Sequence, residues 1–326
     1  MKPTNNYYVS NLVDLGSSEN GAVVIDFSDD FLGKAENILG KGRGIWQEDL
    51  YDEKGKVYDG WGSKRNRDIN NQDWVIIKIA VPCIINIIDI DTNHFKHNSP
   101  LFASIDGGFI ETDEIFNDEE MKWETILNST YISPDKQNLY HIKSNSVINI
   151  IKLKIYPDGG LARLKIYGTP NLDNKLESKD YASELNGGKV IYATETYYGK
   201  MENLIKNYIP SNANDGWGTM RRRRGSYDYV IIKLGKQIEL EEILINTQHF
   251  IGNFPEYCDI EGINKNKFDN YETYKHKKWI ELRKEYKLFS GHEHRITQFE
   301  NDGKYTHIKI SIYPDGGISR IKVIGK

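Results

Sequence analysis

The stretch IYPDGGLARLKIYG at residues 155–168 returns almost unchanged as IYPDGGISRIKVIG at residues 312–325. Three more pairs lie in the same register upstream: DGWGSKRNR (59–67) with DGWGTMRRR (215–223), WVIIKI (74–79) with YVIIKL (229–234), and TNHF (92–95) with TQHF (247–250). The members of each pair are 155 to 157 residues apart. Repetition at one spacing predicts a tandem duplication of one domain of about 150 residues.

The apolar runs in both copies are typical of β-strands. Segments such as NIIKLKIY (149–156) and THIKISIY (306–313) alternate apolar and polar residues. Each is followed by Pro-Asp-Gly-Gly, a turn in which proline fixes φ and glycine accepts a positive φ. Only residues 31–40 and 197–206 suggest a short helix or turn. Strands at short intervals without helices between them predict an all-β fold, with an antiparallel sandwich or jelly roll in each copy.

A polar segment separates the two copies. It follows the closing strand of the first copy and precedes the first apolar run of the second. Because domain boundaries fall in such segments, we expect a first domain at residues 1–170, a linker at 171–188 and a second domain at 189–326.

Composition excludes several classes of partner. The chain carries 43 Lys and Arg against 47 Asp and Glu, a net charge of −4, which argues against nucleic acid or an anionic membrane. The apolar runs are too short to cross a bilayer, and the first residues lack a signal-peptide pattern. The two cysteines, Cys83 and Cys258, are not at equivalent positions. We therefore expect no disulfide framework and a reduced, cytoplasmic setting.

Two arginine positions are common to both copies: Arg65 matches Arg221, and Arg67 matches Arg223. On an extended strand, residues two apart point to one face, and paired guanidiniums suit a carboxylate. We therefore predict that all four arginines bind substrate. The alternative is that they pair with acidic neighbours in their own copy.

His94 and His249 are the histidines that both copies share, each after a predicted strand. A neutral imidazole can act as acid or base near pH 7, although a histidine in this position is often structural. Asp91 precedes His94 by three residues, and its counterpart is Asn246. We predict His94, His249 and Asp91 as the acid–base residues.

The two glycine-rich turns supply four more candidate substrate-binding residues. Asp59 and Asp215 begin the DGWG turns, and Arg163 and Arg320 lie three residues after YPDGG. The tryptophan of DGWG is more consistent with a core residue, and the aspartate of YPDGG with a turn former.

Together, these motifs resemble allantoicase: DGW with its arginine-rich strip, DWVIIKI or DYVIIKLG, TNHF or TQHF with Asn-x-Pro downstream, and IYPDGGxxRxKxxG. The resemblance covers both halves and so nearly the whole chain. It implies two tandem jelly-roll β-sandwich repeats of the galactose-binding-like type. It also implies hydrolysis of allantoate to ureidoglycolate and urea, in purine (allantoin) degradation.

The predicted residues fit that substrate. Allantoate is a small monocarboxylate with two ureido groups, which suits guanidinium anchors and carboxylate or carbonyl acceptors. No metal-ligand spacing is present, so we name no cofactor, and a divalent metal stays an open alternative. We expect a homo-oligomer, because sandwiches with exposed edges often associate.

Two competing interpretations stay open. One is a non-catalytic tandem jelly-roll protein that binds a carbohydrate or another small ligand, because a fold does not imply a function. The other is a chain in which one copy serves only packing, so that the arginines of that copy are dispensable.

Overall fold

The computed structural model describes residues 12–68, 70–111, 116–172, 178–222, 225–265 and 278–326. The chain forms two compact units, Met1–Asn171 and Leu172–Lys326. The second unit includes β13 (Lys179–Asp180), which lies within the expected linker and pairs with the closing strand of that unit. Across the described ranges, no helix has the length and hydropathy of a transmembrane span.

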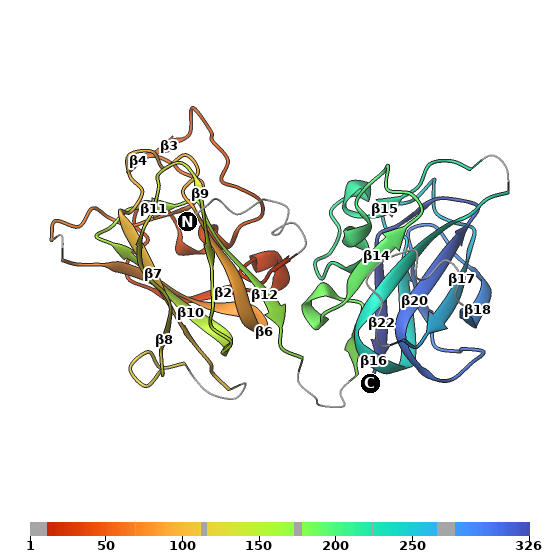
Figure 1. Ribbon diagram of the computed structural model, residues 1–326. Coiled ribbons are helices and arrows are strands. Elements are labelled where there is room, and N and C mark those ends of the chain that lie inside the picture. Colours follow the sequence, from red (N-terminus) through yellow and green to blue (C-terminus); the bar gives the residue numbers. More distant parts are fainter. Residues whose placement is uncertain (1–11, 69, 112–115, 173–177, 223–224, 266–277) are drawn as a thin grey trace. The chain divides into compact units, whose positions relative to one another are not determined.

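The first unit is built almost entirely from strands (Figure 1). They are β1 (Val13–Asp14), β2 (Val23–Phe27), β3 (Tyr51–Asp52), β4 (Gly55–Lys56), β5 (Trp61–Gly62), β6 (Asp73–Asp91), β7 (Phe102–Gly108), β8 (Glu124–Tyr131), β9 (Gln137–His141), β10 (Val147–Tyr156), β11 (Gly160–Leu161) and β12 (Arg163–Pro170). Short 3-10 turns occur at η2 (Ser18–Asn20) and η3 (Ala35–Leu39).

The long strand β6 joins the two layers of a sandwich. Its first half pairs mainly with β2 and β10, and its second half with β9 and β12. Strands β7 and β8 extend the first layer beyond β10, and β1 extends the second beyond β12. All of these pairs are antiparallel, so the unit is the jelly-roll sandwich that the strand pattern predicts.

The second unit repeats this arrangement around β16 (Asp228–Asn246). Its other elements are β13, η4 (Glu184–Asn186), β14 (Lys189–Ala193), η5 (Met201–Ile205), η6 (Ala213–Asp215), β15 (Trp217–Gly218), β17 (Tyr257–Ile263), β18 (Ile280–Lys287), β19 (Glu293–Ile296), β20 (Lys304–Tyr313), β21 (Gly317–Ile318) and β22 (Arg320–Gly325). One layer contains β14, β16, β20, β17 and β18, and the other contains β13, β22, β16 and β19. The prediction of an all-β chain with two tandem jelly-roll repeats is therefore confirmed.

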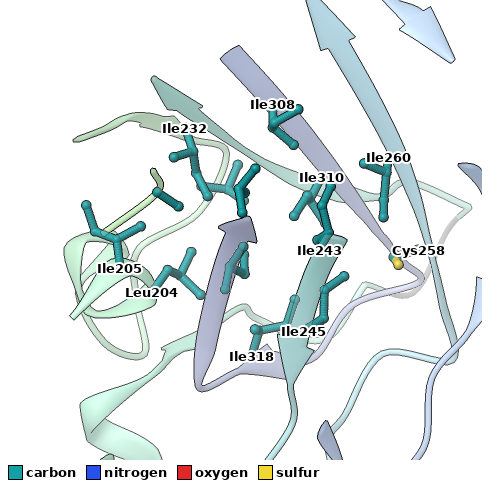
Figure 2. Packing of buried hydrophobic residues seen from close by; sticks show 14 of the residues in the cluster. Leu204, Ile205, Ile232, Ile243, Ile245, Cys258, Ile260, Ile308, Ile310 and Ile318 are labelled. Atoms are coloured by element: carbon teal, nitrogen blue, oxygen red, sulfur yellow. The ribbon is translucent and has the colours of Figure 1, made fainter. Parts of the chain in front are cut away.

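Isoleucine dominates the core between the layers. Figure 2 shows Ile232, Ile243 and Ile310 among the side chains packed between strands of the second unit, with the Cys258 thiol at the edge of the same cluster. Cys83 and Cys258 are both buried free thiols. Burial raises the pKa of Cys83 to about 12, so this thiol is unreactive at neutral pH.

Candidate active site

The repeated motifs meet at one end of each sandwich. In the first unit β5 pairs with β11, which brings DGWG beside YPDGG, and in the second β15 pairs with β21 in the same way. Trp61 and Trp217 are fully buried, and their Nε1 atoms donate to the carbonyl oxygens of Asp29 and Glu195. The interpretation of these tryptophans as core residues is confirmed.

The aspartate side chain of each YPDGG turn accepts a hydrogen bond from the backbone of the arginine-rich strip. Asp158 Oδ2 accepts from the N–H of Asn66 at 2.5 Å, and Asp315 Oδ2 accepts from the N–H of Arg222 at 2.5 Å. The aspartates were predicted to form the turn, but these hydrogen bonds tie the turn to the strip instead, so their turn-forming role stays a prediction. The last glycine of the turn is required by packing, because a Cβ on Gly317 would lie 1.9 Å from the Phe250 ring.

The arginine-rich strip is not a strand. No strand is assigned to residues 63–68, so the expected alternation that would put Arg65 and Arg67 on one face does not apply. Arg65, Arg67 and Arg221 are exposed. Within the described residues none of the three forms an ion pair. Arg223 lies outside the described residues.

Arg222 was not among the predicted substrate-binding arginines, because its counterpart in the first copy is Asn66. In the structure it is bound to a buried carboxylate. Its Nε and Nη2 donate to Asp228, whose side chain is fully buried. Burial raises the pKa of Asp228, but the bonds from Arg222 and Thr194 outweigh it and lower the pKa below the usual value. The first repeat has Asn66 in place of Arg222, so this ion pair belongs to the second repeat.

Arg163 and Arg320 hold the DGWG turns in place. Both are nearly buried, at 4% and 5% exposure. Arg163 donates to the Asp59 carbonyl at 3.0 Å and to its carboxylate at 2.7 Å, whereas Arg320 donates to the Asp215 carbonyl at 2.6 Å. The Asp215 carboxylate instead accepts from Ser211. These four predicted residues thus lie together in pairs, beneath the turns.

The Asp59 carboxylate is engaged on two sides. It also accepts from the Ile45 N–H at 2.8 Å. Burial raises the pKa of Asp59, but the hydrogen bonds from Arg163 and Ile45 outweigh it, so its pKa lies below the usual range. Asp59 is therefore an ionised acceptor at neutral pH.

His94 and His249 share an unusual backbone conformation, with φ of 70° and 69°. Non-glycine residues adopt this left-handed region rarely, and they do so often at functional sites. His249 Nε2 lies 2.9 Å from the Pro210 carbonyl oxygen, which can only accept. The proton is therefore on Nε2 when the ring is neutral, and Nδ1 is the basic nitrogen. The His94 ring packs instead against Trp46, with centroids 5.6 Å apart.

Asp91 is fully buried and forms a two-pronged ion pair with Arg43. The distances are 2.8 Å from Nε to Oδ2 and 2.8 Å from Nη2 to Oδ1. Asp91 Oδ1 also accepts from the Asn93 N–H, just as Asn246 Oδ1 accepts from Gln248. The role common to both repeats is therefore to shape the loop that carries the histidine, and the ion pair is an addition of the first repeat.

An open pocket of about 720 Å³ lies in the second unit at the end where the motifs meet. Its charged lining residues are Arg221, Lys287, Glu256 and Asp315. Aromatic walls come from Tyr198, Phe250, Phe254 and Phe289. Of the predicted arginines, Arg221 thus faces a cavity, and His249 is adjacent in sequence to a lining residue.

Two of these charged residues were missed by the sequence analysis. Glu256 follows the Asn-x-Pro segment, and Lys287 ends β18. The comparison of the two copies passed over them because their counterparts, Leu101 and Tyr131, are uncharged. Among the described residues, no three His, Cys, Asp or Glu side chains gather closely enough to hold a metal ion.

Comparisons with known proteins agree with this organisation. The family model "Allantoicase repeat" matches residues 13–171 and again 179–326. A probable allantoicase of Pseudomonas fluorescens (strain Pf0-1) is 34% identical over 320 residues, covering 96% of each chain, and one of Pseudomonas aeruginosa (strain LESB58) is 34% identical over 324 residues. The crystal structure of allantoicase from Saccharomyces cerevisiae superposes with a TM-score of 0.74 at 31% identity, covering 98% of this chain and 95% of that one. The chain therefore belongs to the allantoicase family, with one allantoicase repeat in each of its two units.

Proposed function

We propose that this protein hydrolyses allantoate to ureidoglycolate and urea, and that the pocket of the second repeat binds the substrate. The observation that carries the location is the convergence of the repeated motifs on a cavity that Arg221 lines. The size suits a small molecule, because pockets for such ligands commonly measure about 300–1,000 Å³.

Arg221 is the proposed anchor of the substrate carboxylate. It is exposed to the pocket and has no carboxylate partner among the described residues, whereas its neighbour Arg222 is neutralised by Asp228. A guanidinium can donate two parallel bonds to a carboxylate, which a lysine cannot reproduce. Arg320 helps to position Arg221, because it donates to the Asp215 carbonyl in the DGWG turn that leads into Arg221.

The reaction breaks the bond between the central carbon and one ureido nitrogen. Water supplies the hydroxyl group of ureidoglycolate and the proton that the leaving urea takes. A base that orients the water and an acid near the leaving nitrogen accelerate such a step. We assign the base to His249, whose Nδ1 is available when Nε2 donates to Pro210. In the first repeat His94 is the corresponding candidate for the base. Asp91 is bound by Arg43 there, so we assign it to positioning rather than to contact with the substrate.

The test is release of urea from allantoate by the purified full-length chain. Arg221→Lys should raise KM about tenfold or more, because one charge-assisted hydrogen bond contributes ~1.5–3 kcal/mol. Binding of allantoate without urea release would instead support the non-catalytic interpretation. An unchanged kcat/KM in Arg221→Lys would remove Arg221 from the site.

Three further properties belong to the same proposal. We propose a cytoplasmic location, consistent with two buried free thiols. Assays with and without a chelator, alongside metal analysis of the purified protein, decide whether a divalent metal takes part. Light scattering on a size-exclusion column measures whether the chain is a homo-oligomer.

A further inference from the structure

Glu256, which lines the pocket, and Leu101, its counterpart in the first repeat, make the same backbone hydrogen bonds. Glu256 donates its N–H to the Tyr313 carbonyl at 2.8 Å, and its own carbonyl accepts from the Leu288 N–H at 2.9 Å. Leu101 makes the same two backbone bonds in the first repeat, at 3.0 Å and 3.0 Å. The position is therefore fixed by the sandwich in both repeats, independently of its side chain.

The side chains on this backbone differ in charge. The second repeat carries Glu256 and Lys287, where the first carries Leu101 and Tyr131. Leu101 and Tyr131 are both 57% exposed, and the Tyr131 ring packs edge-on against Phe102. The first repeat thus presents an apolar surface where the second presents one negative and one positive group.

The fold makes little use of the charges of Glu256 and Lys287. The Lys287 ammonium lies 5.7 Å from the centroid of the Phe289 ring, which also lines the pocket. Within the described residues neither side chain forms a hydrogen bond or an ion pair, although both line the pocket with Arg221. Lysines on the corresponding strands β20 and β10 of the two repeats are paired instead: Lys309 contacts Glu261 at 2.6 Å in the second repeat, and Lys154 contacts Asp106 at 2.6 Å in the first. The charges at the pocket are therefore available to a ligand.

We propose that Glu256 and Lys287 make this pocket selective for a carboxylate that carries a ureido group, which deepens the proposed function and rests on it. Lys287 shares the substrate carboxylate with Arg221. Glu256 accepts an N–H of a ureido group, a donor that a leucine in its place would leave unpaired. Two cations for the carboxylate and an anion for the ureido donors together match both ends of allantoate.

The test replaces each residue by its counterpart from the first repeat, in the full chain. Glu256→Leu should raise KM for allantoate about tenfold, and Lys287→Tyr about fivefold, because each substitution removes one charge-assisted contact at a partly solvated site. Melting temperatures should stay within about 2 °C of wild type, since neither side chain forms a hydrogen bond or an ion pair among the described residues and Lys287→Tyr loses only the contact with the Phe289 ring. Leu101→Ala and Tyr131→Ala, the matched controls in the first repeat, should leave KM unchanged.

Two competitive inhibitors separate the roles of the two residues. N-Carbamoylglycine carries a carboxylate and one ureido group, whereas propionate carries only the carboxylate. Glu256→Leu should raise the inhibition constant of N-carbamoylglycine and leave that of propionate unchanged. Lys287→Tyr should raise the inhibition constants of both. A Glu256→Leu variant with wild-type KM and an unchanged ratio of inhibition constants overturns the proposal.

Failure of the proposed function would give a different result. If wild-type protein releases no urea from allantoate, hydrolysis is refuted. Calorimetric titration with N-carbamoylglycine then decides the selectivity alone: binding that Glu256→Leu abolishes supports it, and no binding by wild type refutes it.

Discussion

Asp89 is a buried carboxylate in the first repeat, and we expect its charge to destabilise that repeat at neutral pH. It is fully buried in β6, its Oδ2 accepts one bond from Gln137, and its Oδ1 has no hydrogen-bond partner in the described part of the chain. Burial, together with the nearby charge of Asp91, raises its pKa to about 6 from an ordinary value of 3.8. The register of β16 places Leu244 at the equivalent position of the second repeat.

The magnitude follows from the size of that pKa difference. A difference of about two units corresponds to ~3 kcal/mol of free energy. Because the folded-state pKa is the higher one, the cost is absent below about pH 4 and complete above about pH 6. Asp89→Leu should therefore raise the free energy of unfolding of the first repeat by ~3 kcal/mol at pH 8 and by about half as much at pH 5.

Denaturant unfolding of wild type and variant at pH 5 and pH 8 measures this difference. Asp89→Asn is the control for volume, because it removes the charge without adding atoms. It should lose the same pH dependence even if its absolute stability is lower. A difference between wild type and both variants that is the same at pH 5 and pH 8 would refute the reasoning.

Three further substitutions test the elements that hold the site, each read from the unfolding of the second repeat. Gly317→Ala should lower the free energy of unfolding by ~2–3 kcal/mol, because its Cβ would overlap the Phe250 ring, and a loss below 0.5 kcal/mol would contradict that packing. Arg320→Met should cost ~2–5 kcal/mol, because it leaves the part-buried carbonyls of Tyr208 and Asp215 without this donor. Retention of wild-type stability would show that these hydrogen bonds are dispensable. Arg222→Asn, the residue of the first repeat, should cost ~1–3 kcal/mol at pH 7. Since Asp228 has a lowered pKa, this last cost should shrink as the pH falls below about 4, and a cost that grows there would be inconsistent with the ion pair.

The repeat structure of the sequence predicted the scaffold well. Residues kept in both copies, such as Trp61 and Trp217 or the glycines of YPDGG, proved to be those that pack or turn the chain. Packing and turn geometry act identically in both units, so comparison of the copies reveals them.

The same comparison was a poor guide to the pocket. Glu256 and Lys287 differ between the copies, and so they were invisible to a search for common residues. The Arg43–Asp91 pair escaped for a related reason, because Arg43 lies in a segment between η3 and β5 that is longer than its counterpart between η5 and β15.

Long-range contacts explain the remaining differences. Arg163 and Arg320 were predicted to bind substrate, and the structure shows in addition that each donates to a turn more than 100 residues away in sequence. No local pattern predicts which backbone carbonyl an arginine will reach across a sandwich. In the structure both arginines position the DGWG turns, and substrate binding by them stays a prediction.

The most direct test of the account compares kcat/KM for allantoate between Arg221→Met and its matched control Arg65→Met. If the second repeat holds the site, Arg221→Met should lower kcat/KM by about a hundredfold, and Arg65→Met should lower it less than twofold. Equal losses in the two variants, or wild-type activity in Arg221→Met, would contradict the assignment of allantoate hydrolysis to the pocket of the second repeat.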